Sequence, residues 1–259
     1  MAQIELRDVS LNYFTTKQET EALRDIQLAV EAGEFISIVG PSGCGKSTLL
    51  SLVSGMIRPT KGKVLIDGTE VSGVSPKVGY MLQHDHLFEW RDVLSNLLVG
   101  AEVRRMDLKK AERKALELLD RYGLGGFARH NPAQLSGGMR QRVALIRTLV
   151  TEPDILLLDE PFSALDYQTR LTLSDEIFNI IKDQGKTAVL VTHDISEAIC
   201  MADRVMVMSK RPSTISSIYS IRFEEGEGLA PWRKRSAGRY NQYFNDIWRE
   251  LEGHVVSAG

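Results

Sequence analysis

The chain has 259 residues, of which 25% are charged, and its formal net charge at pH 7 is −2. This length accommodates one large domain or two small ones, and the near balance of acids and bases argues against a protein that coats nucleic acid. Two cysteines, Cys44 and Cys200, are too few for a disulfide framework and are typical of a reducing cytosol. No apolar stretch approaches the roughly 18 residues that cross a bilayer, and we find no signal-peptide core, so we expect work at a membrane to go through a partner.

Predicted strands and helices alternate along most of the chain. In the N-terminal part, apolar patterns and turn signals predict a helix at 46–55 and strands at 4–9, 26–30, 34–39, 63–67 and 78–83. From 85 to 152 the apolar residues follow helical spacing, and the clearest helix begins after Asp107 and stops at Gly123. Later strands are predicted at 154–159 and 186–192, and later helices at 167–182, 195–202 and 240–251. This order favours an α/β fold, with a parallel sheet covered on both faces and an inserted all-helical segment.

The most informative motif lies between the third predicted strand and the helix after it. It fits G-x-x-x-x-G-K-[ST] and consists of Gly40, Pro41, Ser42, Gly43, Cys44, Gly45, Lys46, Ser47 and Thr48. Glycines let backbone N–H groups turn toward phosphate oxygens, and the helix behind adds its positive N-terminal end. In such a loop Lys46 reaches the β- and γ-phosphates and the Ser47 hydroxyl binds Mg²⁺. We therefore predict a nucleoside triphosphate site in a P-loop NTPase (RecA-like) core; the alternative is a glycine-rich turn without a ligand.

Two acids follow an apolar run at 155–158. Such a run is typical of a buried strand in a parallel sheet, whose carboxyl end opens at the ligand crevice. Asp159 is predicted to hold Mg²⁺, directly or through water, and Glu160 to act as general base or to orient the attacking water. The two acids could instead cap the next helix, but the presence of the phosphate loop favours the roles in Mg²⁺ binding and water activation.

A third motif is the run Leu135-Ser136-Gly137-Gly138-Met139. Ser136 is a good N-cap, and the glycines leave backbone N–H groups exposed at a helix start, which makes an anion site. One nucleotide does not need two such helix ends. We therefore interpret this one as serving the nucleotide of a second copy, with a plain capped helix as the alternative.

Together with Ser163-Ala164-Leu165-Asp166 and His193, these motifs resemble, in order and spacing, the ATP-binding subunits of ABC transporters. The match runs over nearly the whole chain, and the 83–90 segment and the tail most resemble the nitrate, sulfonate and taurine branch of bacterial importers. The resemblance implies one ABC ATPase domain at 1–259. In it, 1–84 and 153–235 form an α/β core with an antiparallel β N-terminal part, 85–152 form a helical subdomain and 236–259 a helical tail.

The resemblance also implies a head-to-tail dimer that encloses two ATP molecules. Each ATP is gripped by the phosphate loop of one copy and by Ser136, Gly137 and Gly138 of the other. Met139 stands where the commonest family pattern has Gln, but backbone N–H groups and Ser136 can still hold phosphate. The resemblance implies roles for four further residues. Gln83 is the hinge glutamine, which senses Mg²⁺ and the γ-phosphate, and His193 is the switch histidine at the γ-phosphate. Tyr13 stacks on adenine, with Phe14 as substitute, and Asp166 joins the two active sites.

As a family member, the chain is expected to hydrolyse ATP and to power a bacterial importer of a small solute, such as a nitrate-, sulfonate- or taurine-like anion. The implied partners are a second copy, two copies of a multispanning permease subunit and, indirectly, a periplasmic or lipid-anchored solute-binding protein; no nucleic acid is expected. The implied location is the cytoplasmic face of the inner membrane. The segment 87–91 lies where family importers receive a short helix of the membrane subunit, with internal packing as the alternative.

A rival function is that of a non-transport ABC ATPase in DNA repair or translation. Such proteins carry zinc-binding cysteine pairs, long coiled coils or two ATPase units per chain, and the sequence has none of these. The run His84-Asp85-His86 offers too few ligands for a metal site on its own, and Met201, Met206 and Met208 are interpreted as packing. The basic run 233–235 is predicted to be a solvated surface segment, with contact to membrane headgroups as the alternative.

Overall fold

The computed structural model describes residues 2–14, 19–163, 165–223 and 230–256. By its internal contacts the chain divides into two compact units, one made of Met1–Ser75 with Leu173–Gly259 and the other of Pro76–Thr172. This division differs from the subdomain boundaries predicted above, which stay a prediction. Among the helices of the described residues, none is both long and apolar enough to cross a membrane.

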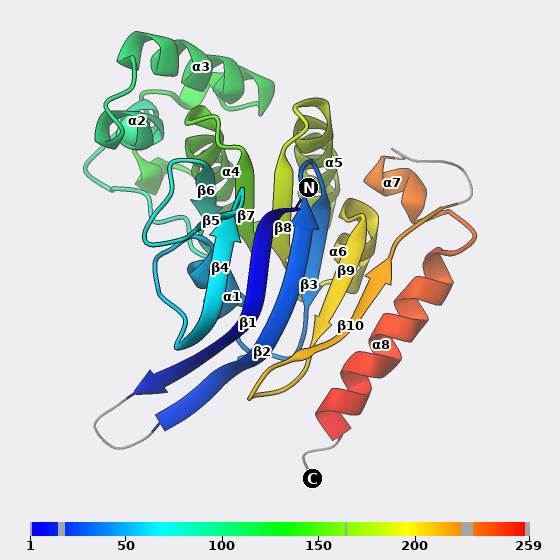
Figure 1. Ribbon diagram of the computed structural model, residues 1–259. Coiled ribbons are helices and arrows are strands. Elements are labelled where there is room, and N and C mark those ends of the chain that lie inside the picture. Colours follow the sequence, from blue (N-terminus) through cyan, green and yellow to red (C-terminus); the bar gives the residue numbers. More distant parts are fainter. Residues whose placement is uncertain (1, 15–18, 164, 224–229, 257–259) are drawn as a thin grey trace. The chain divides into compact units, whose positions relative to one another are not determined.

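The first unit contains an antiparallel sheet near the N-terminus. Its strands are β1 (Ala2–Phe14), β2 (Glu19–Glu31), β4 (Lys61–Ile66) and β5 (Thr69–Glu70), in the order β2-β1-β4-β5. The long strands β1 and β2 lie side by side along most of their length (Figure 1). The antiparallel N-terminal part is therefore confirmed, with β1 and β2 extending well beyond the predicted 4–9 and 26–30.

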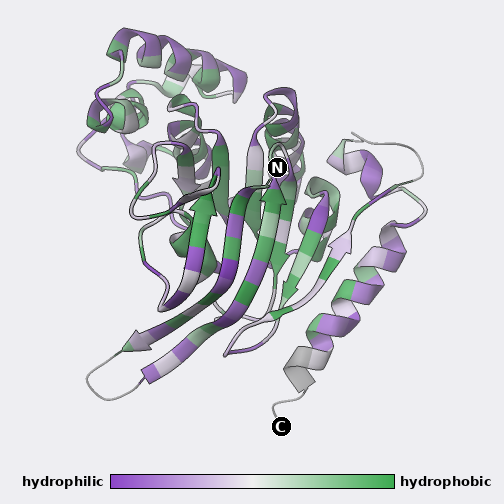
Figure 2. Cartoon of the chain, viewed as in Figure 1, coloured by the Kyte–Doolittle hydropathy of each residue, from purple (hydrophilic) through white to green (hydrophobic). Residues whose placement is uncertain are grey.

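A second group of strands in this unit carries the buried core. The strands β3 (Phe35–Val39), β8 (Thr187–Val191) and β9 (Arg204–Met208) are parallel, and β10 (Ile215–Ser220) runs antiparallel to β9. Every residue of β3 and β8 is buried, and all of them except Ser37 and Thr187 are hydrophobic (Figure 2). Burial on both faces is what a parallel arrangement requires.

Neither β9 nor β10 is predicted from the sequence. In β9, Val205 and Val207 alternate with Met206 and Met208, and all four are buried. Periodicity alone does not distinguish such a short apolar run from the end of a buried helix, and this one comes directly after the helix predicted at 195–202. The interpretation of these methionines as packing residues is confirmed, and Met201 is buried as well.

The helices of this unit are α1 (Lys46–Val53), α6 (Ile195–Met201), α7 (Pro231–Lys234), α8 (Tyr240–Val256) and the later turns of α5 (Tyr167–Asp183). The expectation for the basic run is wrong at Lys234, which is only 7% exposed. Its ammonium lies 4.8 Å from the ring centroid of Phe178 and 6.0 Å from that of Phe223. Aromatic faces attract a cation, and the apolar stem of lysine packs well, so these contacts favour the inward position.

The second unit combines a strand pair with helices. The strands β6 (Val78–Met81) and β7 (Ile155–Asp159) are parallel, and the helices are α2 (Val93–Val103), α3 (Leu108–Arg121) and α4 (Gly137–Val150), with short 3₁₀ turns at Gly125–Phe127 and Pro132–Gln134. The carboxylate of Asp107 accepts hydrogen bonds from the N–H groups of Lys109 and Lys110, which confirms the predicted cap of α3.

Candidate functional site

In the first unit, β3 leads into the predicted phosphate loop and α1 begins at Lys46, as expected. Gly43 and Gly45 have φ of +72° and +113°, a region that favours glycine. The Lys46 ammonium donates hydrogen bonds to the carbonyls of Gly40, at 2.9 Å, and Pro41, at 3.1 Å. These two contacts hold the lysine over its own loop, and an anion offers it stronger, charge-assisted bonds.

The loop leaves little room for a side chain at two glycines. A Cβ at Gly40 lies 3.0 Å from the carbonyl oxygen of Met208, and one at Gly45 lies 2.9 Å from the Leu23 side chain. Cys44 is buried, and burial raises the pKa of its thiol; both cysteines are free, as expected. Ser42, Gly43 and Ser47 remain exposed. These residues leave an open rim at the N-terminus of α1, where backbone N–H groups can meet phosphate.

Arg211 is a loop contact that sequence reasoning missed. Its Nε donates to the carbonyl of Gly43 at 2.6 Å. The residue follows β9, 168 positions from Gly43, and no local pattern indicates such a contact. It holds the loop through a carbonyl, which leaves the loop's N–H groups available to a ligand.

Tyr13, the predicted adenine-stacking residue, lies at the end of β1. Its hydroxyl is 3.2 Å from the hydroxyl of Thr48, the last residue of the phosphate loop, and the side chain is 44% exposed. The structure therefore brings this aromatic to the loop with an open ring face. Phe14 is more exposed, at 68%. Stacking on adenine stays a prediction.

His193 lies at the same sheet edge as the phosphate loop. In the parallel pair of β3 and β8, Ile38 is opposite Val191, and the N–H of Thr192 donates to the carbonyl of Ile38 at 3.3 Å. His193, next along the chain, is exposed. The carboxyl ends of parallel strands form one crevice, so the geometry suits a histidine that reaches a bound phosphate.

In the second unit, β6 and β7 bring three predicted residues together. Asp159, at the end of β7, is 3% exposed, and its Oδ2 accepts a hydrogen bond from the Tyr80 hydroxyl at 3.4 Å. The Gln83 amide donates to a carboxylate oxygen of Glu160 at 3.2 Å. Gln83 lies two residues beyond β6 rather than ending the strand as predicted, because pairing with β7 stops at Met81.

Glu160 has a backbone conformation that is uncommon for its residue type. Its φ is +48°, in the left-handed region where non-glycine residues are strained. The Ser163 hydroxyl and the Gln141 amide both donate to its carbonyl, at 3.1 Å and 3.4 Å. Gln141 is buried on α4 and was missed by sequence reasoning. These contacts hold the strained backbone of Glu160 in place, and such strain is common at catalytic residues.

The helix α4 begins where the sequence predicts. The Ser136 hydroxyl accepts a hydrogen bond from the N–H of Met139 at 3.2 Å, which confirms the N-cap. A Cβ at Gly138 lies 2.9 Å from the end of the Leu165 side chain, so a larger residue there requires that side chain to shift. Ser136 is exposed, and Gly137 and Gly138 are partly so. The helix end therefore presents backbone N–H groups, and the departure at Met139 does not affect the cap.

Two arginines of α4 hold the segment that follows Gln83. Arg147 donates to the carbonyls of Asp85, at 2.7 Å, and His86, at 2.8 Å, and Arg140 pairs with the Asp85 carboxylate at 3.0 Å. The segment 84–86 thus serves as a structural connection. In the part of the chain that the structure describes, no group of three or more His, Cys, Asp or Glu residues could hold a metal ion.

Asp166 has a clear structural role at the start of α5. Its carboxylate accepts a hydrogen bond from the N–H of Thr169 at 3.0 Å, and hydrogen bonding with Thr169 lowers the pKa of this carboxyl. The residue is exposed. Its predicted role in joining two active sites stays a prediction.

Each unit offers oxygen groups of the kind that Mg²⁺ takes. Asp159 and Gln83 of the second unit carry a carboxylate and an amide oxygen, Ser47 of the first unit carries a hydroxyl, and Mg²⁺ prefers such hard oxygen ligands. This ion keeps several waters and takes further ligands from substrate phosphates, so few protein groups are required. The residues present therefore fit the ion.

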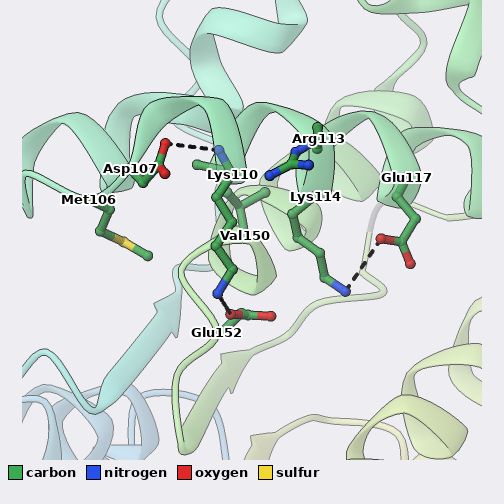
Figure 3. A pocket seen from close by; sticks show the side chains of 9 residues that line it. Met106, Asp107, Lys110, Arg113, Lys114, Glu117, Val150 and Glu152 are labelled. Atoms are coloured by element: carbon green, nitrogen blue, oxygen red, sulfur yellow. Dashed lines mark hydrogen bonds and ion pairs between the residues drawn. The ribbon is translucent and has the colours of Figure 1, made fainter.

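A cavity of about 440 Å³ lies elsewhere on the second unit, beside α3 (Figure 3). Lys110 lies 3.8 Å from Glu152 and Lys114 lies 3.8 Å from Glu117. Basic and acidic side chains are balanced along its wall, and it contains none of the predicted site residues. We assign it no role in nucleotide chemistry.

Comparison with known proteins decides the family. The model of the family described as "ABC transporter" matches residues 23–163. This chain belongs to the ABC transporter family. It is 45% identical over 251 residues to the uncharacterized ABC transporter ATP-binding protein YtlC of Bacillus subtilis, covering 97% of this chain and 96% of the relative. It is 42% identical over 214 residues to the taurine import ATP-binding protein TauB of Yersinia pestis, covering 81% and 84%.

A solved structure supports the same assignment. The dimeric post-hydrolysis structure of the ATP-binding cassette MJ0796, bound to ADP and Pi, superposes with a TM-score of 0.77 and 32% identity, over 85% of this chain and 99% of that one. The predicted fold is confirmed as an ABC cassette, and the protein is an ABC transporter ATPase.

Proposed function

We propose that this ATPase powers an importer of a small anionic solute of the taurine, sulfonate or nitrate type. The observation that carries the proposal is that several relatives are named taurine import ATP-binding proteins. These include one from Yersinia pestis at 42% identity and one from Roseobacter denitrificans at 36% identity over all of this chain. We place the protein at the cytoplasmic face of the inner membrane, bound to two permease subunits that receive solute from a binding protein.

The segment 87–91 supports a permease partner. Trp90 is 78% exposed, and its ring lies 4.9 Å from that of Phe88. The fully buried amide of Asn96 fixes this segment, since it donates to the carbonyls of Phe88 and Arg91, both at 3.1 Å, and accepts from the N–H of Phe88 at 2.7 Å. A rigid loop that exposes a large aromatic side chain suits capture of a short helix.

In this mechanism two copies assemble head to tail. Lys46 and the backbone N–H groups of residues 42–47 bind the β- and γ-phosphates of ATP, and Tyr13 stacks on adenine. Ser136 and the N–H groups of Gly137 and Gly138 of the second copy hold the γ-phosphate. The N-termini of α1 of one copy and of α4 of the other point at the phosphates. Their positive ends stabilise the negative charge that develops during hydrolysis.

Hydrolysis then depends on three side chains. Glu160 accepts the proton of the attacking water or orients it, and Gln83, which donates to that carboxylate, fixes its direction. His193 contacts the γ-phosphate and helps to hold the water. Ser47, Asp159 and Gln83 would hold Mg²⁺, which would neutralise charge on the phosphate oxygens.

The test of the catalytic assignment is Glu160→Gln, with Glu117→Gln as an exposed control. The amide keeps the shape but cannot take a proton, so we expect ATP hydrolysis to fall by at least about a hundredfold. ATP binding should stay intact, and ATP-bound dimers should accumulate in size-exclusion chromatography. Steady hydrolysis at the wild-type rate rules out the role of Glu160, and monomers at saturating ATP rule out the dimer.

The importer assignment needs a separate test. Trp90→Ala should lose co-purification with a multispanning permease from membranes while keeping the basal ATPase rate. In proteoliposomes that contain permease and binding protein, taurine, a second alkylsulfonate and nitrate are compared with a neutral sugar. Stimulation by the sugar alone, or stimulation of the isolated ATPase by DNA or ribosomes, contradicts the proposal.

A further inference from the structure

The C-terminal helix α8 is firmly anchored to the first unit. The Glu250 carboxylate accepts hydrogen bonds from the Ser217 hydroxyl, at 2.7 Å and 2.8 Å, and from the Tyr219 hydroxyl, at 2.7 Å, both on β10. Ile247 is fully buried. The Tyr243 hydroxyl bonds to the backbone N–H and carbonyl of Arg222, both at 3.1 Å. Since both hydrogen bonds and an apolar anchor hold it, α8 is a fixed part of this unit.

The tail, defined here as residues 231–253, also reaches the first turn of α6. Arg235, directly after α7, donates from Nε to the Ser196 hydroxyl at 3.2 Å. At the start of α8, burial raises the pKa of Tyr240, and a hydrogen bond with the Ser196 side chain opposes that effect. Two elements of the tail therefore meet at one serine, three residues after His193.

That first turn is connected to His193 by a short chain of hydrogen bonds. The Asp194 carboxylate accepts from the N–H groups of Ser196, at 2.8 Å, and Glu197, at 3.2 Å. The N–H of Asp194 donates to the Thr192 hydroxyl at 3.0 Å, and that hydroxyl donates to Glu197 at 2.6 Å. The residues on both sides of His193 are thus fixed to the turn that the tail contacts. A displacement of this turn moves the backbone of His193 with it.

On its exposed side, His193 faces α8 across a cavity. The cavity measures about 630 Å³ and is lined by Phe244, Trp248, Leu251 and Glu252 of α8 and by residues 193–195. The rings of Phe244 and Trp248 are stacked, 6.3 Å apart at an interplanar angle of 8°. The histidine therefore borders both this cavity and the turn that the tail contacts.

We infer that the tail is a positioning element for His193, acting through Arg235 and Ser196 on the first turn of α6. This inference rests on the proposed role of His193 at the γ-phosphate. The tail then sets the rate of ATP hydrolysis rather than the affinity for ATP, because small displacements of a reacting group cost rate while binding depends on other residues. A change that shifts α8 on β10, such as contact with a partner, alters turnover by the same route.

The test compares Arg235→Ala with Arg249→Ala, a matched removal of an exposed arginine from α8. We expect Arg235→Ala to lower kcat about three- to tenfold with KM for ATP unchanged, and to speed amide hydrogen exchange at residues 194–197. Ser196→Ala should give the same loss, and the double variant no further loss. Arg249→Ala should change neither quantity.

The same variants on a His193→Ala background separate this inference from the proposed function. If the tail acts through His193, Arg235→Ala has no further effect on the single-turnover rate in that background. An equal loss in both backgrounds, a raised KM with unchanged kcat, or unchanged exchange at 194–197 overturns the inference. Wild-type hydrolysis by His193→Ala alone overturns the role of the histidine instead.

Discussion

Replacement of Lys234 by methionine tests how much the burial of this charged side chain, which was not predicted from the sequence, costs in folding free energy. Burial lowers the pKa of Lys234 from 10.5 to about 8, the charges of Asp203 and Cys200 oppose this effect, and that of Lys182 adds to it. Lys182 itself pairs with Asp203 at 2.7 Å, so that carboxylate is shared. The charge of Lys234 is therefore stabilised by the shared Asp203 carboxylate and by the faces of Phe178 and Phe223.

The magnitude follows from the pKa difference. A tenfold change in proton affinity is worth about 1.4 kcal/mol, so a fall from 10.5 to about 8 corresponds to about 3 kcal/mol of folding free energy at neutral pH. The attraction between the lysine cation and the two rings offsets about 1 kcal/mol of this cost. Methionine keeps the apolar stem and removes the charge. We therefore expect Lys234→Met to stabilise the protein by about 2 kcal/mol at pH 7.

The pH dependence has a definite sign. Below pH 8 the lysine is charged in both the folded and unfolded states, so the advantage of Lys234→Met is constant there. Between pH 8 and 10.5 the unfolded state binds more protons, and the stability contribution of the wild-type lysine rises with pH. The advantage of the variant should shrink over this window.

Urea unfolding at pH 7, 8, 9 and 10, followed by circular dichroism, measures the difference between the two proteins. Lys109→Met, at an exposed position of α3, serves as control and should show no such trend. An advantage that is constant from pH 7 to 10, or a variant that is less stable at every pH, refutes the reasoning.

Two further predictions follow from local contacts. Lys46→Ala should weaken ATP binding about tenfold to a hundredfold, because a charge-assisted contact to phosphate is lost; isothermal titration calorimetry measures this, and unchanged affinity contradicts the role of the loop. Asp107→Ala should destabilise the protein by about 1 kcal/mol in urea unfolding, because two N–H groups of α3 lose their acceptor. Asp107→Asn keeps an acceptor and should recover most of that loss, whereas equal losses argue against the cap.

Contiguous motifs could be predicted from the sequence because their function lies in local backbone geometry. The loop at 40–48 needs glycine at positive φ, and Ser136 and Asp107 cap the helices that follow them. Each of these signals lies within a few residues, where propensity and hydrogen bonding act directly. The buried run of β7 was equally clear, since uninterrupted apolar residues followed by an acid fit a parallel strand.

Contacts between distant segments could not be predicted in the same way. Arg211 holds the carbonyl of Gly43, and Gln141 holds that of Glu160. A lone arginine or glutamine has no pattern that indicates its partner. The inward position of Lys234 was missed for a related reason: charge runs are usually solvated, and only the surrounding rings make burial tolerable.

The amino-acid sequence by itself determined that this protein binds nucleoside triphosphate and belongs with the ABC transporter ATPases, because phosphate recognition uses short stretches of backbone. Tertiary structure alone decided that Gln83 meets Glu160, that Tyr13 reaches Thr48, and that the tail supports the turn beside His193. These pairs lie 35 to 77 residues apart in the chain. Strand pairing and helix packing bring them together, and both depend on the burial of whole faces rather than on any local run of residues.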